Sequence, residues 1–522
     1  MPERKQSGAG AARKARAKPA AQTQPISAET ERLLDDLEAA IQDGDGERVQ
    51  ALSEGLWAAR KEAPEALTRR LIAGRVAVPG FAFELLAGLA GSRTPTYLRR
   101  IAKDRVADDL TRFAAQRRAG WPEATEAARR RSFLDTLGDA DGTLVRAATN
   151  ASQAWPPNGE ALQEVLRYLV VLAPERRQEI AARIIGEPVE ETTWVLHAFL
   201  QFDDPALQRL ALAEVAKRRE PGSAAAVDRL ARTATDEGVR AEAAAAAPRL
   251  RLQVVGSATA APRPLPPLDR ALLSAIDGDG GQVLLIIRRA GEGVFLFADF
   301  FHNDDFGLKD TFGATWANTD QIEMMVEALE GDGIPLIDID EAAARGALAA
   351  AIDRNVALGR QLPPSFELWE PLAHDTYPAA PDEAVVAPEL DDAPYAGRSR
   401  LLADSAELLA HPFFDAWFFN PDEMAPALLD VPQPGPSGRL TDRQFRPLIE
   451  RLVPPETRRN LRGRLRRQAW LLDREGDTQE RDRALAAAAA LADGASPPHK
   501  HPLLREMVVV SLVNLSGLLF LE

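Results

Sequence analysis

The spacing of apolar residues divides the chain into two helical regions with a short stretch of strands between them. From residue 27 to residue 255, apolar residues recur at the i, i+3, i+4 spacing of amphipathic helices, with breaks at turns that contain Gly, Pro or Asp. Residues 282–288 (QVLLIIR) and 294–300 (VFLFADF) are instead short, apolar and rich in β-branched or aromatic residues, and RAGEG joins them as in a hairpin. We therefore predict a mostly α-helical protein with a small antiparallel sheet near its middle.

The same patterns, with two stretches rich in proline, predict six segments along the chain. They are a disordered basic tail at 1–26, an α-helical repeat array at 27–255, a Pro-rich linker at 256–268, an α+β domain at 269–376, an acidic linker rich in Pro and Ala at 377–398, and an all-helical C-terminal domain at 399–522. The two predicted strands are apolar on both faces, which indicates a sheet covered by helices on each side.

Helices are expected on both sides of the second linker. In the α+β domain they are predicted at 319–330 and 341–359, separated by the short apolar piece IPLIDID. In the C-terminal domain they are predicted at 400–410, 422–429, 442–452, 456–473, 479–493 and 502–521.

Two segments of the array repeat each other at an offset of 32 residues. DDPALQRLALAEVAKRRE begins at Asp203 and TDEGVRAEAAAAAPRLRL begins at Thr235. Their alignment pairs an acidic turn and then three apolar positions, namely Leu207 with Val239, Ala211 with Ala243, and Val215 with Ala247. A helical hairpin of this kind cannot bury its apolar face alone, so we expect neighbouring hairpins to stack and complete the core.

These segments resemble HEAT repeats, whose second helix opens with an acidic turn, a Val-Arg pair and an Ala-rich inner face. The matching residues are Asp236, Glu237, Val239, Arg240, Ala243 and Ala247. Helical repeats followed by FGLKDTFG (306–313) and LGRQLPPSF (358–366) are similar to the arrangement in bacterial HEAT-repeat proteins of unknown function. Since that family has no established activity, the resemblance implies a fold and assigns no catalytic residue.

Composition narrows the possible chemistry and location. The chain has no cysteine, which excludes disulfides, a thiolate nucleophile and cysteine-ligated metals, so only oxygen and imidazole ligands remain. The first 25 residues are polar and basic and lack the apolar core of a secretory signal, so we expect a cytoplasmic protein. The apolar stretch at 507–521 is shorter than the roughly 18 to 20 residues of a membrane span, which predicts a buried terminal helix and no membrane partner.

The segment ADFFHNDDFGLKDTFG, residues 298–313, gathers a histidine, four acids and a lysine. A metal site there would use His302 and Asp304 with Asp299 or Asp310, a ligand set that suits Mn, Fe or Zn. Alternatively, the strand ends near Phe300 and HNDDFG is a turn, with Asn303 and Asp304 bonding to the local backbone and Gly307 at positive φ. In that case four aromatic residues would pack into the core, namely Phe300, Phe301, Phe306 and Phe312. We prefer the turn, and predict no metal, cofactor or catalytic residue; DGDGG at 277–281 is likewise read as a turn, because it lacks the later ligands of a calcium loop.

An arginine-rich segment at 458–467 is the candidate interaction site. On a helix Arg458, Arg462 and Arg466 form one row, which can bind phosphates or an acidic partner, or can be a solvated face neutralised by the acids of this chain. The net charge of −15 argues against general nucleic-acid affinity.

Our leading hypothesis is a non-catalytic interaction scaffold for a protein partner of unknown identity. One alternative is a metal-dependent hydrolase or nuclease centred on residues 299–310. The other is a nucleic-acid-associated protein that uses the basic tail and the 458–467 helix.

Overall fold

The structure is a computed structural model, and the chain in it forms two compact units. It describes residues 26–519 apart from 44, 121–125, 154–156, 188–192, 219–221, 257–262, 378–387, 430–439 and 493–496. Of the predicted basic tail at 1–26, only Ile26 is among the described residues. One unit is Met1–Arg129 with Leu137–Asp139, and the other is Arg130–Thr136 with Ala140–Glu522. The boundary therefore falls inside the predicted array, whereas the sequence placed one at the Pro-rich segment 256–268.

The first unit is built from helices, as the spacing of its apolar residues predicts. They are α1 (Ala28–Asp43), α2 (Gly46–Ala58), α3 (Ala63–Ile72), α4 (Pro79–Ala90), η1 (Gly91–Arg93), α5 (Thr94–Lys103), α6 (Asp109–Ala119) and the start of α7 (Glu126–Leu134). The side chains of Asp45 and Asp108 cap α2 and α6 by accepting backbone N–H groups of Arg48 and Thr111. The core is formed by buried leucines and by Phe83 and Phe113.

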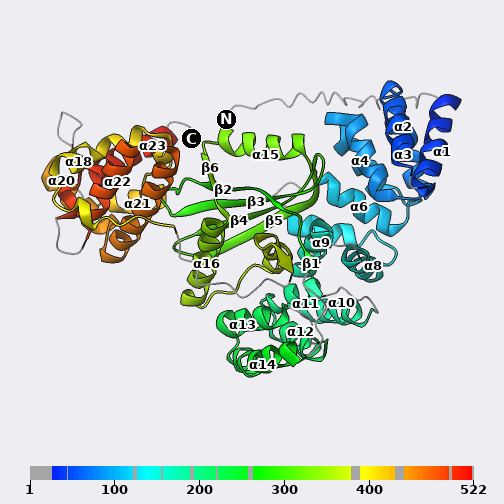
Figure 1. The fold of residues 1–522 in the computed structure, drawn as a ribbon, viewed down its shortest axis with the longest axis horizontal. Helices are drawn as coiled ribbons and strands as arrows, with labels where there is room; N and C mark the ends of the chain where they lie inside the picture. The colour runs from blue at the N-terminus through cyan, green and yellow to red at the C-terminus, as the bar shows by residue number, and fades with distance from the viewer. Residues whose placement is uncertain are drawn as a thin grey trace, which may run out of the picture. The chain divides into compact units, whose positions relative to one another are not determined.

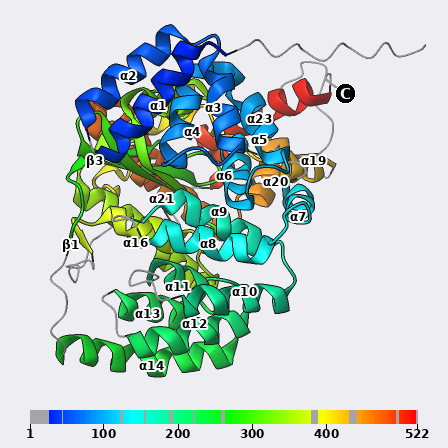
Figure 2. The same cartoon turned by 90° about the vertical axis from the view of Figure 1, so that its right-hand side faces the viewer.

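The second unit begins with a run of helices that pack on one another in succession (Figure 2). They are α8 (Ala140–Ser152), α9 (Gly159–Val170), α10 (Pro174–Gly186), α11 (Thr193–Leu200), α12 (Pro205–Arg218), α13 (Ser223–Thr233) and α14 (Glu237–Gly256). The paired apolar residues at the offset of 32 are all buried.

The polar contacts of the two repeated segments match as well. Asp204 accepts from the backbone N–H of Leu207 at 3.1 Å, and Asp236 accepts from that of Val239 at 2.8 Å. Each carboxylate also binds an arginine from the preceding repeat, since Arg177 Nη1 lies 3.1 Å from Asp204 and Arg209 Nη2 lies 2.9 Å from Asp236. The two segments are therefore structurally equivalent at these positions.

The central sheet has five antiparallel strands in the order β5-β4-β3-β2-β6. The strands are β2 (Leu268–Ser274), β3 (Gly281–Gly291), β4 (Val294–Asn303), β5 (Gly307–Asn318) and β6 (Leu336–Ile339). The predicted hairpin is β3–β4, with longer strands than expected and a tight turn in which Gly293 has φ 64°. The strand predicted to end near Phe300 continues to Asn303. Neither β2 nor β5 was predicted as a strand, because LDRALLS and GLKDTFGATWAN carry a weak β signal.

Helices cover both faces of the sheet, as its apolar strands predict (Figure 1). α15 (Thr319–Gly331) packs on the face formed by Val283, Leu285 and Ile287, while α16 (Glu341–Leu358) and α17 (Phe366–Trp369) contact the opposite face. Phe300 is fully buried on the α16 face.

Two of the four phenylalanines that were expected in the core are exposed. Phe306 is 44% exposed and Phe312 is 40% exposed, so the prediction was wrong for both. Phe306 lies in the β4–β5 turn, where its ring is covered by cations: Lys309 Nζ is 4.9 Å and Arg360 Cζ is 4.2 Å from the ring centroid.

Buried polar contacts connect helices α9 and α13 of the array with the central domain. Gln163 of α9 donates to the carbonyl oxygen of Thr311 at 2.8 Å and accepts from Trp369 Nε1 at 3.1 Å. Arg229 of α13 binds both carboxylate oxygens of Glu367, at 3.0 and 2.5 Å. These contacts explain why no unit boundary falls at 256–268.

The end of the predicted Pro-rich linker belongs to the fold. β1 (Arg263–Pro264) pairs with β7 (Thr376–Tyr377), and the fully buried Arg288 donates to the carbonyl oxygens of Pro266 and Leu372 at 2.8 and 2.7 Å. Residues 263–268 are thus held against the sheet rather than left as a tether.

The C-terminal region is helical, as predicted. It contains α18 (Ser399–Ala403), η5 (Asp404–Ala410), η6 (Pro412–Phe414), α19 (Pro421–Leu429), α20 (Asp442–Leu452), α21 (Pro455–Glu475), α22 (Thr478–Ala490), η7 (Pro498–Lys500) and α23 (Pro502–Leu519). In α23 the side chains of Leu504, Met507 and Val508 are buried. Among the helices that the structure describes, none is long and apolar enough to cross a membrane.

Asp299 is a buried carboxyl group on the α15 face of β4, and it makes folding dependent on pH. Its Oδ1 has no hydrogen-bond partner within the described residues, and burial, with the nearby charge of Asp310, raises its pKa to about 7. Because the folded pKa exceeds the unfolded value of about 3.9, loss of this proton favours the unfolded state, and the free energy of unfolding falls as the pH rises toward and through 7.

Asp299→Asn is expected to remove this dependence. Asparagine carries no charge to desolvate. The free energy of unfolding of Asp299→Asn should therefore exceed that of the natural chain by a margin that is about 2–3 kcal/mol larger at about pH 8.5 than at about pH 5. Urea denaturation at the two pH values measures this difference. Asp332→Asn, which changes an exposed carboxyl after α15, should show no such dependence. An equal gain for Asp299→Asn at both pH values would contradict the assignment.

Candidate functional site

Arg464 of α21 joins three segments that are far apart in the sequence. Its Nε and Nη2 donate to the two carboxylate oxygens of Asp304 at 2.8 and 2.7 Å, and Nη2 also donates to Asp305 at 2.9 Å. Nη1 donates to the carbonyl oxygen of Gly278. The arginine helix, the HNDDFG segment and the DGDGG loop therefore meet at one buried guanidinium, and we call Arg464, Asp304, Asp305 and Gly278 the Arg464 cluster.

The DGDGG loop fits this cluster because of its glycines. Gly280 has φ 86°, and a Cβ at this position would lie 1.9 Å from Asp304 Oδ1, so a side chain there would displace the carboxylate. Asp277 Oδ1 accepts from the backbone N–H of Gly281 at 2.6 Å, which closes the loop on itself. The segment is a turn, as predicted.

HNDDFG also contains the predicted turn, with one correction. Asn303 Oδ1 accepts from the backbone N–H of Asp305 at 2.7 Å, and Gly307 has φ 80°, both as expected. The side chain of Asp304, however, binds arginines of α21 instead of the local backbone, since Arg467 Nη2 also donates to its Oδ2 at 2.7 Å. Two cations close to one carboxylate outweigh the single local hydrogen bond that a turn would offer.

Together with Arg467, the Arg464 cluster brings two cations against two carboxylates. Arg464 is only 4% exposed, and burial would lower its pKa, but hydrogen bonding to Asp304 and the charges of Asp304 and Asp305 raise it instead. A buried guanidinium is tolerated because nearly all its donors are used.

His302 lies next to this cluster in sequence, on the α16 face of β4. Its side chain is 5% exposed, and within the described residues its Nε2 has no hydrogen-bond partner. The pKa of His302 is lowered to about 4, mainly by burial. The charge of Arg467 also lowers it, and this effect is larger than the opposite effect of the charge of Asp304. The imidazole is therefore neutral at physiological pH.

His302 lines a cavity of about 160 Å³ between the sheet, α16 and α21, which we call the His302 cavity. Its polar lining residues are Gln282, His302, Asn303, Asp304, Arg354 and Arg467, and its apolar lining includes Ala350, Ala351 and Trp470. Nε of Arg354 is buried, and no partner for it occurs among the described side chains and backbone. Two of the residues that line this small cavity thus each carry a buried nitrogen without a partner among the described residues.

The candidate metal ligands do not converge. Asp299 is on the α15 face while His302 is on the α16 face, because side chains alternate along β4. Asp310 is exposed and accepts from the backbone N–H of Thr311 at 2.8 Å. Across the part of the chain that the structure describes, no group of three or more His, Asp or Glu side chains could hold a metal ion.

The predicted interaction row is occupied by acids of the same chain. Arg462 binds both oxygens of the fully buried Asp392 at 2.7 and 2.8 Å. Arg466 lies 3.1 Å from Glu389 and donates to the carbonyl oxygen of Leu390 at 2.8 Å. Residues 389–392 of the predicted acidic linker are thereby held against α21. Arg458 is half-buried at the N-terminal end of the same helix.

A partner that binds the row of Arg458, Arg462 and Arg466 would have to displace these internal acids. Its use as an interaction site remains a prediction.

Sequence reasoning missed Arg354 and Trp470. A weak signal exists for Arg354, because it continues the buried face of α16 that runs through Ala343, Ala347 and Ala351. A lone arginine at the end of an alanine face indicates a site only once the cavity beside it is known.

Comparisons of the chain with protein-family models, with curated proteins and with solved structures found no match. The resemblance to HEAT-repeat proteins therefore stays a prediction, and function has to be inferred from the residues themselves.

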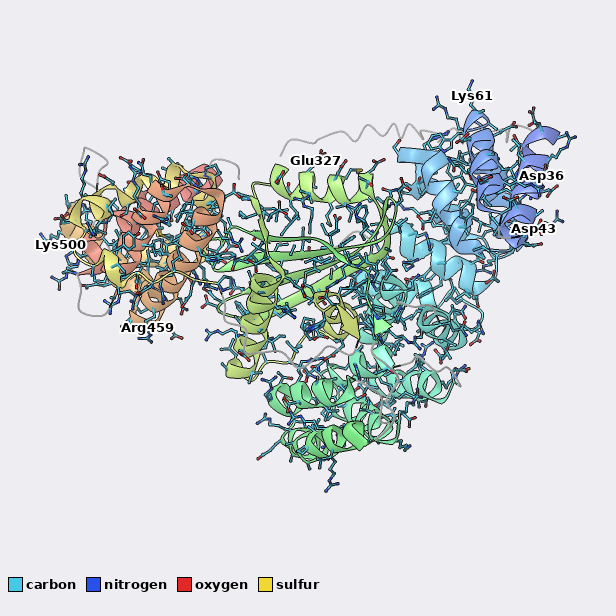
Figure 3. The ribbon with its side chains drawn as sticks, viewed as in Figure 1. Asp36, Asp43, Lys61, Glu327, Arg459 and Lys500 are labelled. Atoms are coloured by element: carbon cyan, nitrogen blue, oxygen red, sulfur yellow. The ribbon has the colours of Figure 1, made fainter. Side chains whose placement is uncertain are left out.

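Removal of the central guanidinium should strongly destabilise the second unit. Arg464→Met leaves Asp304 and Asp305 with too few partners, so we expect the free energy of unfolding to fall by about 3–5 kcal/mol. Arg459→Met is the matched control, because Arg459 lies exposed on the surface of the same helix (Figure 3). Its effect should stay within about 0.5 kcal/mol in the same denaturant titration. Similar losses for the two variants would show that Arg464 is not the organising contact.

Proposed function

We propose that this protein is a non-catalytic binding protein that holds a small molecule in the His302 cavity, and that its helical array contacts a protein partner. The observation that carries the proposal is that His302, one of the residues that line the cavity, is nearly fully buried and has an Nε2 without a partner among the described residues. A buried polar atom without a partner costs about 1–3 kcal/mol, and almost all such atoms in native proteins are paired. A ligand in the cavity would supply the missing hydrogen bond.

The composition of the cavity supports binding. Small-molecule sites are concave and mostly apolar, with a few polar groups that set the orientation of the ligand. The His302 cavity has this composition, and its walls come from β4, α16 and α21, two of which the Arg464 cluster ties together. A site with walls fixed in advance loses little conformational entropy on binding.

The two alternative functions have less support. A metal-dependent hydrolase or nuclease needs His302, Asp304 and a third ligand in one cleft, whereas Asp304 is bound by Arg464 and Arg467. The imidazole of His302 is also a weak base, because its pKa is about 4. A nucleic-acid site on α21 would need Arg462 and Arg466, which bind Asp392 and Glu389.

For the protein partner, the array offers a second concave surface. A cavity of about 430 Å³ is lined by Val170 and Phe202 from the array and by Lys309 and Pro363 from the central domain. Val170 is 55% exposed, although it is a large apolar residue. Exposed apolar groups beside charged ones are typical of interaction surfaces.

Val170→Glu is expected to lower the recovery of any protein that co-purifies with the natural chain at least about tenfold, because it puts a charge into this apolar surface. Affinity purification from the native host followed by quantitative mass spectrometry measures this recovery. Val509→Glu is the control, since Val509 is an exposed apolar residue in α23. Equal loss with both variants would remove the array surface from the proposal.

Binding in the His302 cavity can be tested without knowledge of the natural ligand. Ala350 is an exposed residue of α16 at the cavity, so Ala350→Trp should fill the entrance and leave the fold intact. We expect fragments that bind the natural chain in ligand-observed NMR to lose at least about 90% of their signal with this variant.

Ala342→Trp is the control, because Ala342 is exposed on the same helix away from the cavity lining. It should bind the same fragments as the natural chain. A fragment library that binds nowhere, or binds Ala350→Trp unchanged, would contradict the proposed function.

A further inference from the structure

We propose that the His302 cavity takes a small organic carboxylate, whose anionic group is bound by Arg354 and Arg467 and whose apolar body lies against Trp470 and the alanines of α16. This inference rests on the function proposed above and specifies the chemical class of its ligand. It is carried by the charges, the unpartnered nitrogens and the apolar walls of one cavity.

The charge of the cavity lining favours an anion. The charged residues in the lining are Arg354, Arg467 and Asp304. Asp304 is already bound through both oxygens by Arg464, with Arg467 as a second partner. The buried Nε of Arg354 has no such acid among the described residues, and arginine keeps its proton at any physiological pH. One positive charge at the cavity is therefore not balanced by its lining.

His302 can add a hydrogen bond to the same anion. The neutral imidazole has one N–H donor, and in the tautomer with a proton on Nε2 this donor belongs to the atom that lacks a partner. Burial keeps the pKa of His302 near 4, so the ring binds as a neutral donor across the physiological range. His302 thus joins Arg354 and Arg467 as a possible donor in the lining of the cavity.

The remaining walls select an organic anion over an inorganic one. Leu273, Ala347, Ala351 and Leu471 line the cavity with Trp470. The amides of Gln282 and Asn303 also line it, but they already donate to the carbonyl oxygens of Ser274 and Asp279. Phosphate would need donors for three or more oxygens, whereas a planar carboxylate needs donors for two and matches the fork of a guanidinium. The volume of about 160 Å³ limits the ligand to a small molecule.

Matched probes test the charge requirement on the full chain. Benzoate and benzamide have nearly the same shape but differ in charge, and butyrate and butyramide form a second such pair with a flexible body. Titration calorimetry of all four, with inorganic phosphate as a further probe, should show at least one carboxylate binding about tenfold or more tightly than its amide. Phosphate should bind more weakly than that carboxylate.

The role of Arg354 is tested by substitution. Arg354→Met should weaken binding of the preferred carboxylate about tenfold or more and leave the matching amide nearly unchanged, while Arg354→Lys keeps the charge and should restore part of the affinity. Arg345→Met removes an arginine of the same helix outside the cavity lining and should behave as the natural chain. Circular dichroism establishes that each variant is folded before titration.

His302→Phe keeps a ring in the cavity and removes both nitrogens. We expect it to weaken binding of the carboxylate without loss of stability, because Nε2 has no partner to lose among the described residues.

Three results would overturn the inference: amides that bind as well as their carboxylates, phosphate that binds more tightly than either carboxylate, or an Arg354→Met variant that retains full affinity. Failure of the proposed function is a different outcome, namely fragments that bind Ala350→Trp unchanged or do not bind at all. A natural chain that binds fragments in the cavity but shows no preference for anions would keep the proposed function and remove the carboxylate.

Discussion

The buried guanidinium of Arg464 decides how the C-terminal helices meet the central sheet. A cation with almost no access to water is stable only where acceptors surround it, and here Asp304, Asp305 and the carbonyl oxygen of Gly278 do so. Any sliding of α21 along the sheet would separate these acceptors from the arginine. The cluster therefore fixes one register, whereas apolar contacts alone would tolerate several.

The His302 cavity follows from this register. Asp304 is bound to α21 on one side, and its neighbour His302 is carried on β4 against α16. Arg467 lies one helical turn from Arg464, binds Asp304 and also lines the cavity. The same helix therefore supplies both the structural cation Arg464 and a cation of the cavity lining. A rigid cluster directly beside a small cavity holds the orientation of its polar groups, which is what selective binding requires.

Local patterns predicted most of the fold and little of the site. The helices at 319–330 and 442–452 and the β3–β4 hairpin were predicted, because their periodicity is local and strong. β5 escaped because its glycines and polar residues gain their stability from the sheet next to them, which a single strand does not reveal. The sequence also drew attention to His302 and Asp304, but gave Asp304 the wrong partners. Arg464 is 160 positions away, and no local signal encodes a contact over that distance.

The charge balance of the chain explains why its arginines were easy to misinterpret. With a net charge of −15, an arginine row on a helix resembles a binding surface for an external anion. In the folded chain Arg462 and Arg466 instead bind Asp392 and Glu389, while Arg464 and Arg467 share Asp304. Internal acids thus bind the cations that looked available, whereas the buried Nε of Arg354, at the end of the alanine face of α16, has no acceptor among the described residues. In a protein so rich in acids, an arginine whose acceptor is missing at a cavity is a better guide to a ligand than a cluster of arginines on a surface.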